Sequence, residues 1–486
     1  MQSRILLSVL AATIAFGATA EAQGFTIGNV VVVRVGDGSS ALTSAAAPIF
    51  LDEYTTTGTF VQSLPLPTGT IGNQRAITVR GNATSEAFLN VSISGAYLTM
   101  CGYDAAPGTA AALTQDAAAN VTNRVIARVD LNGAIDTSTA LTDAYSGGGG
   151  NPRSVISDDG NQFWISGTST VNGGVRYVTS LGDTTSLGLN AGSPTNVRCI
   201  NAFDGQLYVS SASGANIGIN VYGDQLPTTP GQLVTQLPGF PTTGGTQAAS
   251  AYDVFFADEN TLYVADDNAV ASTVGGIQKW VRNAGTWTLA YRLQLGGPGA
   301  NTACRGLTGF VRDGVTTLGG TANTSNTGAA ATQLVPVTDT GPGSTVVSLA
   351  TSPLSTAFRG VRFLAKPTTL QRIPAACGTA GIKVTGNAEI GTVVRTTILT
   401  PSAIPFVGYG LAPLGVPLCG CTLVTDFVSS GLLFAGATSA LPLPNSPSVV
   451  GAQIYIQGVD LDVFSAPGCL GLPLFTLTDG FSVTVQ

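Results

Sequence analysis

The feature that most limits what this chain can fold into is an internal repeat. Each copy has a charged residue, an apolar strand, an acidic or glycine turn, and a strand of aromatic and aliphatic residues. Six copies begin, in chain order, at Glu86, Arg153, Arg198, Asp253, Arg305 and Arg359. Successive copies start 45 to 67 residues apart, which suits a blade of four strands with loops of variable length. The repeat therefore predicts a β-propeller.

The blade count follows from how the copies are completed. Five copies are followed by an outer hairpin, with turns such as Asn132-Gly133. The last copy supplies one strand, whereas the region before the first copy supplies three unpartnered strands in residues 29–66. Pairing these two ends would close the ring and remove its exposed edges. We therefore predict six blades closed by N- and C-terminal strands, and seven if 102–122 or 323–332 contain further strands.

Composition agrees with an all-β chain. There are 62 glycines in 486 residues, only 10% of residues are charged, and no helical pattern is sustained. The net charge is −7 and the basic residues are scattered, so we expect no nucleic-acid partner. Beyond the N-terminus no stretch of roughly twenty apolar residues predicts a transmembrane span.

The N-terminus has the pattern of an export signal. Arg4 precedes an apolar run over residues 5–16, and Ala20-Glu21-Ala22 supplies small residues for cleavage. We therefore predict a signal peptide over 1–22 and a secreted, extracellular or cell-surface protein, with the periplasm as the alternative.

The remaining chain divides into two parts. The propeller is predicted over 23–366, and a proline-containing linker follows over 367–376. Alternating apolar stretches separated by glycine and proline turns then predict a small β-sandwich over 377–486.

Seven cysteines in an exported chain predict disulfide bonds. The even set in the tail is the expected one: Cys377, Cys419, Cys421 and Cys469. Cys419 and Cys421 are too close in sequence to bridge each other easily, so each would pair with Cys377 or Cys469 in an order left open. The propeller holds the other three, Cys101, Cys199 and Cys304. Their odd number implies a free thiol or a bond between chains.

The tail also resembles a C-terminal module of uncharacterised secreted proteins of environmental bacteria. The matching residues are Cys377-Gly378, the Cys-Gly-Cys-Thr-Leu run over 419–423, the run over 441–458 and the segment around Cys469. The propeller resembles the partners of such modules in the runs that begin at Arg34 and Thr84. The resemblance implies export and a two-part layout, and it carries no catalytic residues.

The chain has no histidine. This excludes Ser-His-Asp and Cys-His catalysis, histidine-ligated zinc and a histidine general base. Paired-carboxylate chemistry, a divalent cation held by oxygen ligands and arginine recognition of anions remain. No cofactor is predicted, although calcium stays possible.

The main candidate binding site is the set of residues that open the repeats, here named the channel-mouth ring. Its members are Glu86, Arg153, Arg198, Asp253, Arg305 and Arg359. In register, they would converge on the mouth of the central channel, with the two acids facing each other between arginines. One interpretation is a belt of salt bridges that locks the blades together. The other is that the two arginines left without an acid bind a carboxylate, sulfate, phosphate or acidic sugar.

Two hypotheses of function follow. The favoured one is a secreted, non-enzymatic binding or cell-surface protein, whose propeller binds an extracellular protein, a glycan or a small anion while the tail serves anchoring, export or adhesion. The alternative is a metal- or carboxylate-dependent extracellular hydrolase or lyase at the channel mouth. It would need Glu86, Asp253 and an amide such as Asn151 or Asn196 to converge. The sequence assigns no catalytic residue and no oligomeric state.

Overall fold

A computed structural model describes the chain from residue 24 onward, with gaps. It leaves out 1–23, 242–249, 269–274, 294, 296–302, 313, 324–327, 366–369, 374, 378–380, 386–387, 389, 400, 402–403, 419–420, 427–430 and 463–473. The predicted signal peptide, Cys419 and Cys469 therefore lie outside the described residues. Within them, no helix is long and apolar enough to cross a membrane.

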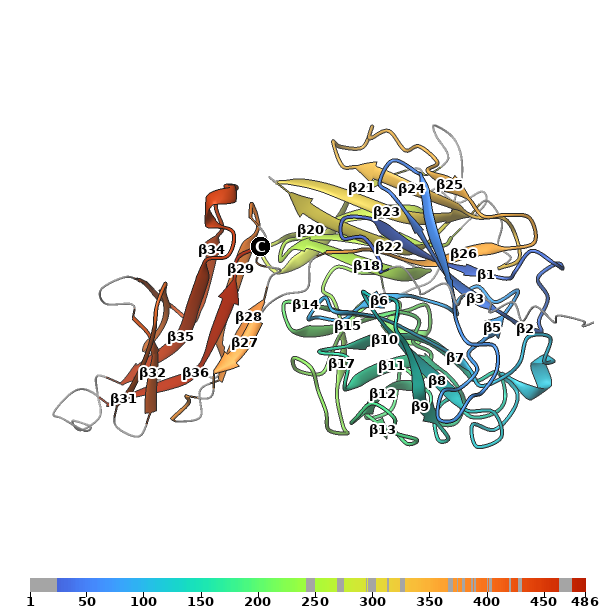
Figure 1. The fold of residues 1–486 in the computed structure, drawn as a ribbon, viewed down its shortest axis with the longest axis horizontal. Coiled ribbons are helices and arrows are strands. Elements are labelled where there is room, and N and C mark those ends of the chain that lie inside the picture. The colour runs from blue at the N-terminus through green and yellow to red at the C-terminus, as the bar shows by residue number, and fades with distance from the viewer. Residues whose placement is uncertain are drawn as a thin grey trace, which may run out of the picture.

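The propeller prediction is confirmed by six four-stranded antiparallel sheets (Figure 1). From the channel outward, blade 1 contains β26 (Ala357–Phe363), β1 (Val30–Val35), β3 (Ile49–Tyr54) and β4 (Phe60–Pro65). Blade 2 contains β6 (Asn90–Val91), β7 (Tyr97–Tyr103), β8 (Arg124–Asp130) and β9 (Ile135–Leu141). Blade 3 contains β10 (Asn151–Ser157), β11 (Phe163–Thr168), β12 (Gly174–Val178) and β13 (Leu187–Gly188).

The second half of the ring repeats this order. Blade 4 contains β14 (Ile200–Phe203), β15 (Gln206–Ser211), β16 (Gly218–Tyr222) and β17 (Val234–Gln236). Blade 5 contains β18 (Ala251–Asp258), β19 (Thr261–Asp266), β20 (Gly276–Asn283) and β21 (Thr286–Leu293). Blade 6 contains β22 (Ala303–Arg312), β23 (Val315–Asn323), β24 (Gln333–Thr338) and β25 (Ala350–Thr351). The loops add the pair β2 (Ala46–Ala47) and β5 (Val79–Arg80) and the short 3₁₀ turns η1 (Ala111–Leu113) and η2 (Gly214–Asn216).

The ring is closed as predicted, by pairing of the two ends of the propeller sequence. β1 lies antiparallel to β26, with Val30 opposite Phe363 and Val35 opposite Ala357. The closure hides the edges of both strands, and all of β1 except Arg34 is buried.

The blades are held together by apolar side chains that meet between neighbouring sheets. In blade 3, Trp164 of β11 packs in one cluster with Ile200 and Leu207 of blade 4. In blade 4, Tyr208 of β15 contacts Phe256 of blade 5, with ring centroids 4.5 Å apart. The aromatic position of the repeat thus serves packing between blades.

Two glycines allow the innermost strands to approach closely. A Cβ atom on Gly306 would lie 2.3 Å from the carbonyl oxygen of Arg359, and one on Gly360 would lie 2.2 Å from the backbone nitrogen of Leu89. A side chain at either position would force the strands apart. Because each glycine follows a ring arginine, the close approach also brings Arg305 and Arg359 near each other.

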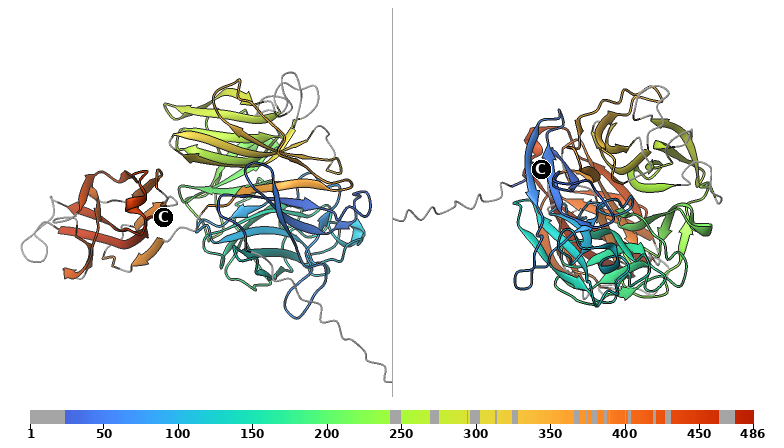
Figure 2. Two further views of the ribbon diagram at one scale, coloured as in Figure 1. Left: turned by 45° about the horizontal axis from the view of Figure 1, so that its top comes forward. Right: turned by 90° about the vertical axis from the view of Figure 1, so that its right-hand side faces the viewer.

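The tail forms a second all-β body beside the propeller (Figure 2). One sheet contains β27 (Leu370–Ile373), β36 (Leu474–Thr484), β35 (Gln453–Asp462), β30 (Ile404–Gly410) and β33 (Leu432–Ala435). A second contains β28 (Gly381–Thr385), β29 (Val393–Leu399) and β34 (Thr438–Pro442). A hairpin of β31 (Pro413–Leu418) and β32 (Cys421–Thr425) and the 3₁₀ turn η3 (Pro447–Val449) complete it.

The tail differs from the sequence prediction at its start. β27 falls within the range predicted as a linker, 367–376, but it pairs with β36 and so belongs to the tail sheet. The pairing uses backbone groups, which a short polar segment provides as well as an apolar one. The disulfide joins Cys377 to Cys421, one of the two partners left open for Cys421. In the propeller, Cys101, Cys199 and Cys304 are buried free thiols.

Candidate functional site

The ring residues lie where the innermost strands begin, at one end of the central channel. Four of them are the third residue of their strand: Arg153 in β10, Asp253 in β18, Arg305 in β22 and Arg359 in β26. Arg198 precedes β14 and Glu86 precedes β6. The structure thus places all six residues at or just before the start of an innermost strand, although the carboxylate of Asp253 contacts Arg362 further along β26.

A β-bulge or similar irregularity interrupts the pairing at each of the four strand positions. The register shifts between Pro152 and Ser154 in β10 and between Ala251 and Val254 in β18. It also shifts between Cys304 and Leu307 in β22, and β26 is irregular where it pairs with β1 across residues 358–361. Such irregularities break the strict alternation of side chains and can turn a charged residue toward the channel.

We expected Asp253 to face Glu86 in a shared ring. Asp253 instead belongs to a lower layer of the channel. Its carboxylate pairs with Arg362, from Nη1 to Oδ2 at 2.6 Å and from Nη2 to Oδ1 at 3.1 Å. The backbone nitrogens of Leu307 and Val254 also donate to it. Arg362 lies three residues beyond Arg359 on β26, so a residue outside the ring is the partner of this acid.

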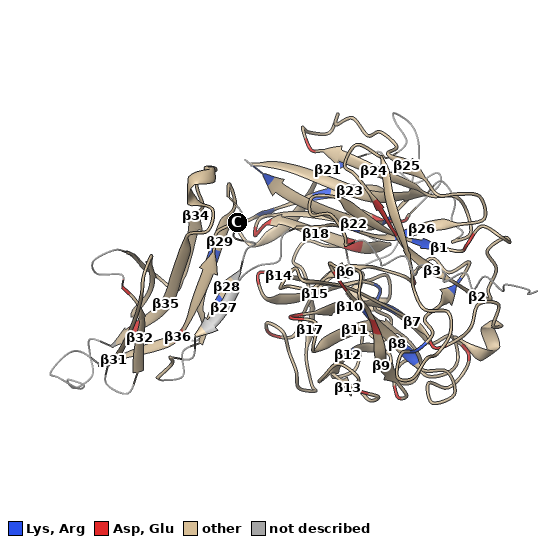
Figure 3. Ribbon diagram, in the orientation of Figure 1, with Lys and Arg blue, Asp and Glu red and all other residues tan. Residues whose placement is uncertain are grey.

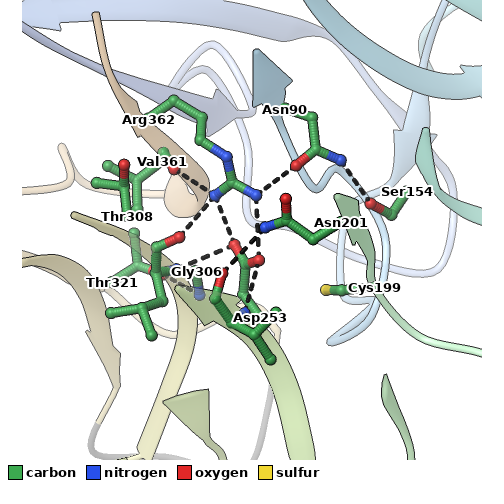
Figure 4. A network of polar contacts seen from close by, with 12 residues as sticks. Asn90, Ser154, Cys199, Asn201, Asp253, Gly306, Thr308, Thr321, Val361 and Arg362 are labelled. Carbon is green, nitrogen blue, oxygen red and sulfur yellow. Dashed lines mark hydrogen bonds and ion pairs between the residues drawn. The ribbon is translucent and has the colours of Figure 1, made fainter. Parts of the chain in front are cut away.

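The lower layer is defined here as Asn90, Asn201, Asp253 and Arg362 (Figure 4). Arg362 links Asp253 and Asn90 through hydrogen bonds, and Asn201 donates to the carbonyl oxygen of Val254 beside them. Arg362 donates to Asn90 Oδ1 and to the carbonyl oxygens of Leu307 and Val361. Asn90 in turn donates to Ser154 Oγ at 3.2 Å. Asp253 is fully buried and Arg362 is 7% exposed. The charges in this layer are paired and saturated with partners.

The mouth above this layer is rich in arginine. Arg153 donates to Asn196 Oδ1 at 2.6 Å and to the carbonyl oxygen of Val197. Arg198 donates to Ser250 Oγ and stacks on the ring of Tyr252, 4.0 Å from its centroid. These partners are neutral and leave both positive charges uncompensated by a direct ion pair among the described residues.

A second group of arginines, Arg80, Arg305 and Arg359, is here named the arginine arc. Arg359 Nη2 donates to the carbonyl oxygens of Arg80 and Gly81, at 3.0 and 2.6 Å. Arg305 Nε pairs with Asp267 at 2.9 Å. Arg80 donates to Gln115 Oε1 and, at 3.4 Å, to Asn82 Oδ1.

Four of the five mouth arginines each keep one buried nitrogen with no hydrogen-bond partner in the described part of the chain. The four atoms are Arg80 Nε, Arg153 Nε, Arg305 Nη2 and Arg359 Nη1. A buried charged donor without a partner is costly, and natural proteins rarely tolerate one. Figure 3 shows how sparse charged residues are along the ribbon, which makes this concentration of arginine notable. The mouth therefore holds four guanidinium nitrogens for which the described residues supply no acceptor.

Burial and mutual repulsion both act on these guanidinium groups. Burial, and then the charge of Arg198, lower the pKa of Arg153 to about 10, although Glu86 acts in the opposite direction. Burial lowers the pKa of Arg359 to about 10 as well, with Arg305 and Arg80 adding to the effect and Glu86 opposing it. An anion between these groups would relieve the repulsion.

Glu86 is a carboxylate whose charge acts on arginines of both groups, since it opposes the lowering by burial of the pKa of Arg153 and of Arg359. It is fully buried, and Tyr103 Oη and Asn151 Nδ2 donate to its Oε1 at 3.0 and 2.7 Å. The backbone nitrogen of Arg80 donates to Oε2 at 2.8 Å. In the described residues Glu86 makes no ion pair, so its charge is held by neutral donors beside cationic groups.

The two interpretations of the ring can now be compared with its contacts. Of its four arginines, only Arg305 has an ion pair among the described residues, and its partner Asp267 lies outside the ring. The contacts thus differ from a closed belt of salt bridges. Sequence reasoning missed Arg80 and Arg362; the second arginine of the Arg-Gly-Val-Arg run at 359–362 was the available signal for Arg362.

Two other features of the described residues bear on the site. A cavity of about 510 Å³ lies between blades 1 and 6, at the end of β1 and β26 away from the mouth. Its lining includes Val30, Leu334, Val347 and Phe363 together with threonines, and no titratable side chain. No group of three or more Cys, Asp and Glu residues in the described chain is placed to hold a metal ion.

Comparison with known proteins finds similar structures but no similar sequence family. No protein-family model and no curated protein matches the sequence, so nothing supports the resemblance to uncharacterised secreted bacterial proteins. A sialidase of Trypanosoma rangeli is 11% identical with a TM-score of 0.41, over 96% of this chain and 91% of the sialidase. A candidate 6-phosphogluconolactonase of Bacteroides fragilis is 10% identical with a TM-score of 0.37, over 85% of this chain and 98% of its own. The GH74 enzyme of Niastella koreensis is 13% identical with a TM-score of 0.34, over 89% and 72%.

These similar structures do not agree with the favoured hypothesis of function. They are mostly enzymes, whereas we predicted a non-enzymatic binding or cell-surface protein; the alternative of a hydrolase or lyase agrees better. The favoured hypothesis rested on the missing histidine, the polar uncharged surface and the absence of a catalytic motif, although carboxylates can also carry acid–base chemistry. At this level of similarity no reaction is transferred, and any reaction must be argued from the residues of this chain.

Proposed function

We propose that the chain is a secreted hydrolase or lyase that acts on an anionic substrate at the mouth of the propeller channel. The observation that carries the proposal is a buried carboxylate, Glu86, set beside arginines whose buried N–H groups have no partner in the described chain. The export pattern at the N-terminus and the Cys377–Cys421 disulfide support secretion.

In this proposal the arginines bind and Glu86 transfers the proton. The guanidinium groups at the mouth, Arg359 among them, hold the anionic substrate and stabilise the negative charge that develops in the transition state. Glu86 accepts a proton from the attacking water in hydrolysis, or from carbon in elimination. The hydrogen bonds from Tyr103 and Asn151 orient its carboxylate. Asp253 has no part in the reaction because its carboxylate is paired with the guanidinium group of Arg362.

The test is turnover of chromogenic esters and glycosides that carry a carboxylate, sulfate or phosphate group, compared with uncharged analogues. We expect measurable hydrolysis or elimination of an anionic substrate, and a decrease in kcat of about 10²- to 10⁴-fold in Glu86→Gln. Glu259→Gln is the matched control, because Glu259 is exposed on the turn between β18 and β19.

Two results would contradict the proposal. One is the absence of turnover with every anionic substrate, and the other is equal kcat values for Glu86→Gln and the wild-type protein. Thermal unfolding of each variant must accompany the kinetics, so that a folding defect is not mistaken for a catalytic one.

A further inference from the structure

The arginine arc differs from an ordinary carboxylate clamp in how its donors are presented. A carboxylate is best bound by the two parallel N–H groups of one guanidinium. In the arc, protein partners already hold part of each guanidinium: Gln115 and Asn82 for Arg80, Asp267 for Arg305, and two carbonyl oxygens for Arg359. Each arginine is thereby fixed in position, while one of its nitrogens has no partner in the part of the chain that the structure describes.

The three arc residues come from neighbouring parts of the ring. Arg305 and Arg359 lie on the innermost strands of blades 6 and 1, which approach closely at Gly306. Arg80 ends β5 and contacts Arg359 directly through its carbonyl oxygen. Three separately anchored guanidinium groups therefore lie close enough to act on one another, and each keeps one nitrogen without a partner among the described residues: Nε of Arg80, Nη2 of Arg305 and Nη1 of Arg359.

Donors presented by three guanidinium groups suit a group that offers oxygens in several directions. A sulfate or phosphate ester has three terminal oxygens in a pyramid, whereas a carboxylate has two in one plane. Arg305 and Arg359 are 6% and 5% exposed, so the group would be bound largely out of water, where charge-assisted hydrogen bonds are strong.

The excess of positive charge at the mouth also favours a sulfate or phosphate over a carboxylate. The mouth has five guanidinium groups and three nearby carboxylates, which are those of Glu86, Asp266 and Asp267. A doubly charged phosphate or a sulfate would compensate more of this excess than a single carboxylate does.

We propose that Arg80, Arg305 and Arg359 form a subsite for the tetrahedral oxyanion of a sulfate or phosphate ester, with one N–H donor from each arginine. The inference rests on the proposed function for the reaction, but not for the binding. Arg153 and Arg198 lie outside the subsite and contact other parts of the substrate.

The test uses the full secreted chain and titrates inorganic sulfate, inorganic phosphate and acetate against sodium chloride of equal ionic strength. Binding is followed by calorimetry and by thermal unfolding. We expect sulfate or phosphate to bind and stabilise the protein, and acetate to do neither. Preference for sulfate over pH 6 to 8 would identify a sulfate ester as the source, and preference for phosphate a phosphate ester.

The variants locate the subsite. Arg80→Gln is the main one, because Arg80 is partly exposed and its loss leaves the strand core intact; we expect it to weaken sulfate or phosphate binding by about 10- to 100-fold. Arg305→Gln and Arg359→Gln should act similarly, and Arg153→Gln by less than about threefold. Arg282→Gln, which removes an exposed charge on β20, is the control and should change nothing.

Two outcomes would overturn the subsite: no stabilisation beyond that given by chloride, or unchanged affinity in Arg80→Gln. Failure of the proposed function is a separate result. If the protein binds sulfate through the arginine arc but turns over no ester, the subsite is supported and the proposed activity is contradicted. If Arg80→Gln turns over a carboxylate substrate as well as the wild-type protein does, the activity is supported and the subsite is contradicted.

Discussion

Two arginines on one strand of the propeller show how differently the two layers of the channel treat charge. Arg362 pairs with the carboxylate of Asp253 and also donates to Asn90 and two carbonyl oxygens. Among the described residues, Arg359, three residues earlier on β26, donates only to carbonyl oxygens and its Nη1 has no partner. A buried charge with a full set of partners belongs to the framework of the fold, whereas the incomplete one is the group that we propose binds an anion.

The largest effect should come from breaking the paired layer. Arg362→Met leaves the buried carboxylate of Asp253 without its counter-charge, and we expect it to lower the free energy of unfolding by about 3–5 kcal/mol. Urea unfolding followed by tryptophan fluorescence measures the change. Combining Arg362→Met with Asp253→Leu removes both charges and should recover most of the loss. If the double variant is no more stable than Arg362→Met, desolvation is not the cause.

A smaller effect should come from Asp266, at the edge of the mouth. Burial raises its pKa from 3.8 to about 6, against hydrogen bonds from the backbone nitrogens of Asn268 and Ser250. Between these two pKa values the folded state binds a proton that the unfolded state has lost, so its contribution to stability falls as pH rises from about 4 to 6.

Asp266→Asn removes this titration and keeps an oxygen to accept a hydrogen bond. We expect it to raise the free energy of unfolding by about 2 kcal/mol at pH 7 and to leave it nearly unchanged at pH 4. Urea unfolding at pH 4, 5, 6 and 7 tests this, with Asp258→Asn at the end of β18 as the control. Equal gains at pH 4 and pH 7 would contradict the assigned pKa shift.

The smallest effect should come from a mouth arginine. Arg153→Met removes two hydrogen bonds but also removes a buried unpaired N–H group and the repulsion from Arg198. We therefore expect the free energy of unfolding to change by less than about 1 kcal/mol, against the several expected for Arg362→Met. Similar losses for both variants in the same urea experiment would erase the distinction between the layers.

The position of the candidate site was predictable to a large extent, but its contacts were not. The repeat placed Arg153, Arg305 and Arg359 at equivalent strand positions, and the structure brings them to one end of the channel. Arg80 stands outside the repeat and joins the mouth from a loop strand, so no periodicity marked it.

The sequence by itself determined the all-β class, the six blades and the closure of the ring, because repeat length and strand pattern are local properties. Only the tertiary structure decided which charges pair. The bulges at Asp253 and Arg359 set the direction of side chains that strict alternation would have placed otherwise. Pairing across the channel also joins residues more than a hundred positions apart, such as Asp253 and Arg362. Local sequence patterns carry no record of such distances, since they arise only when the ring has closed.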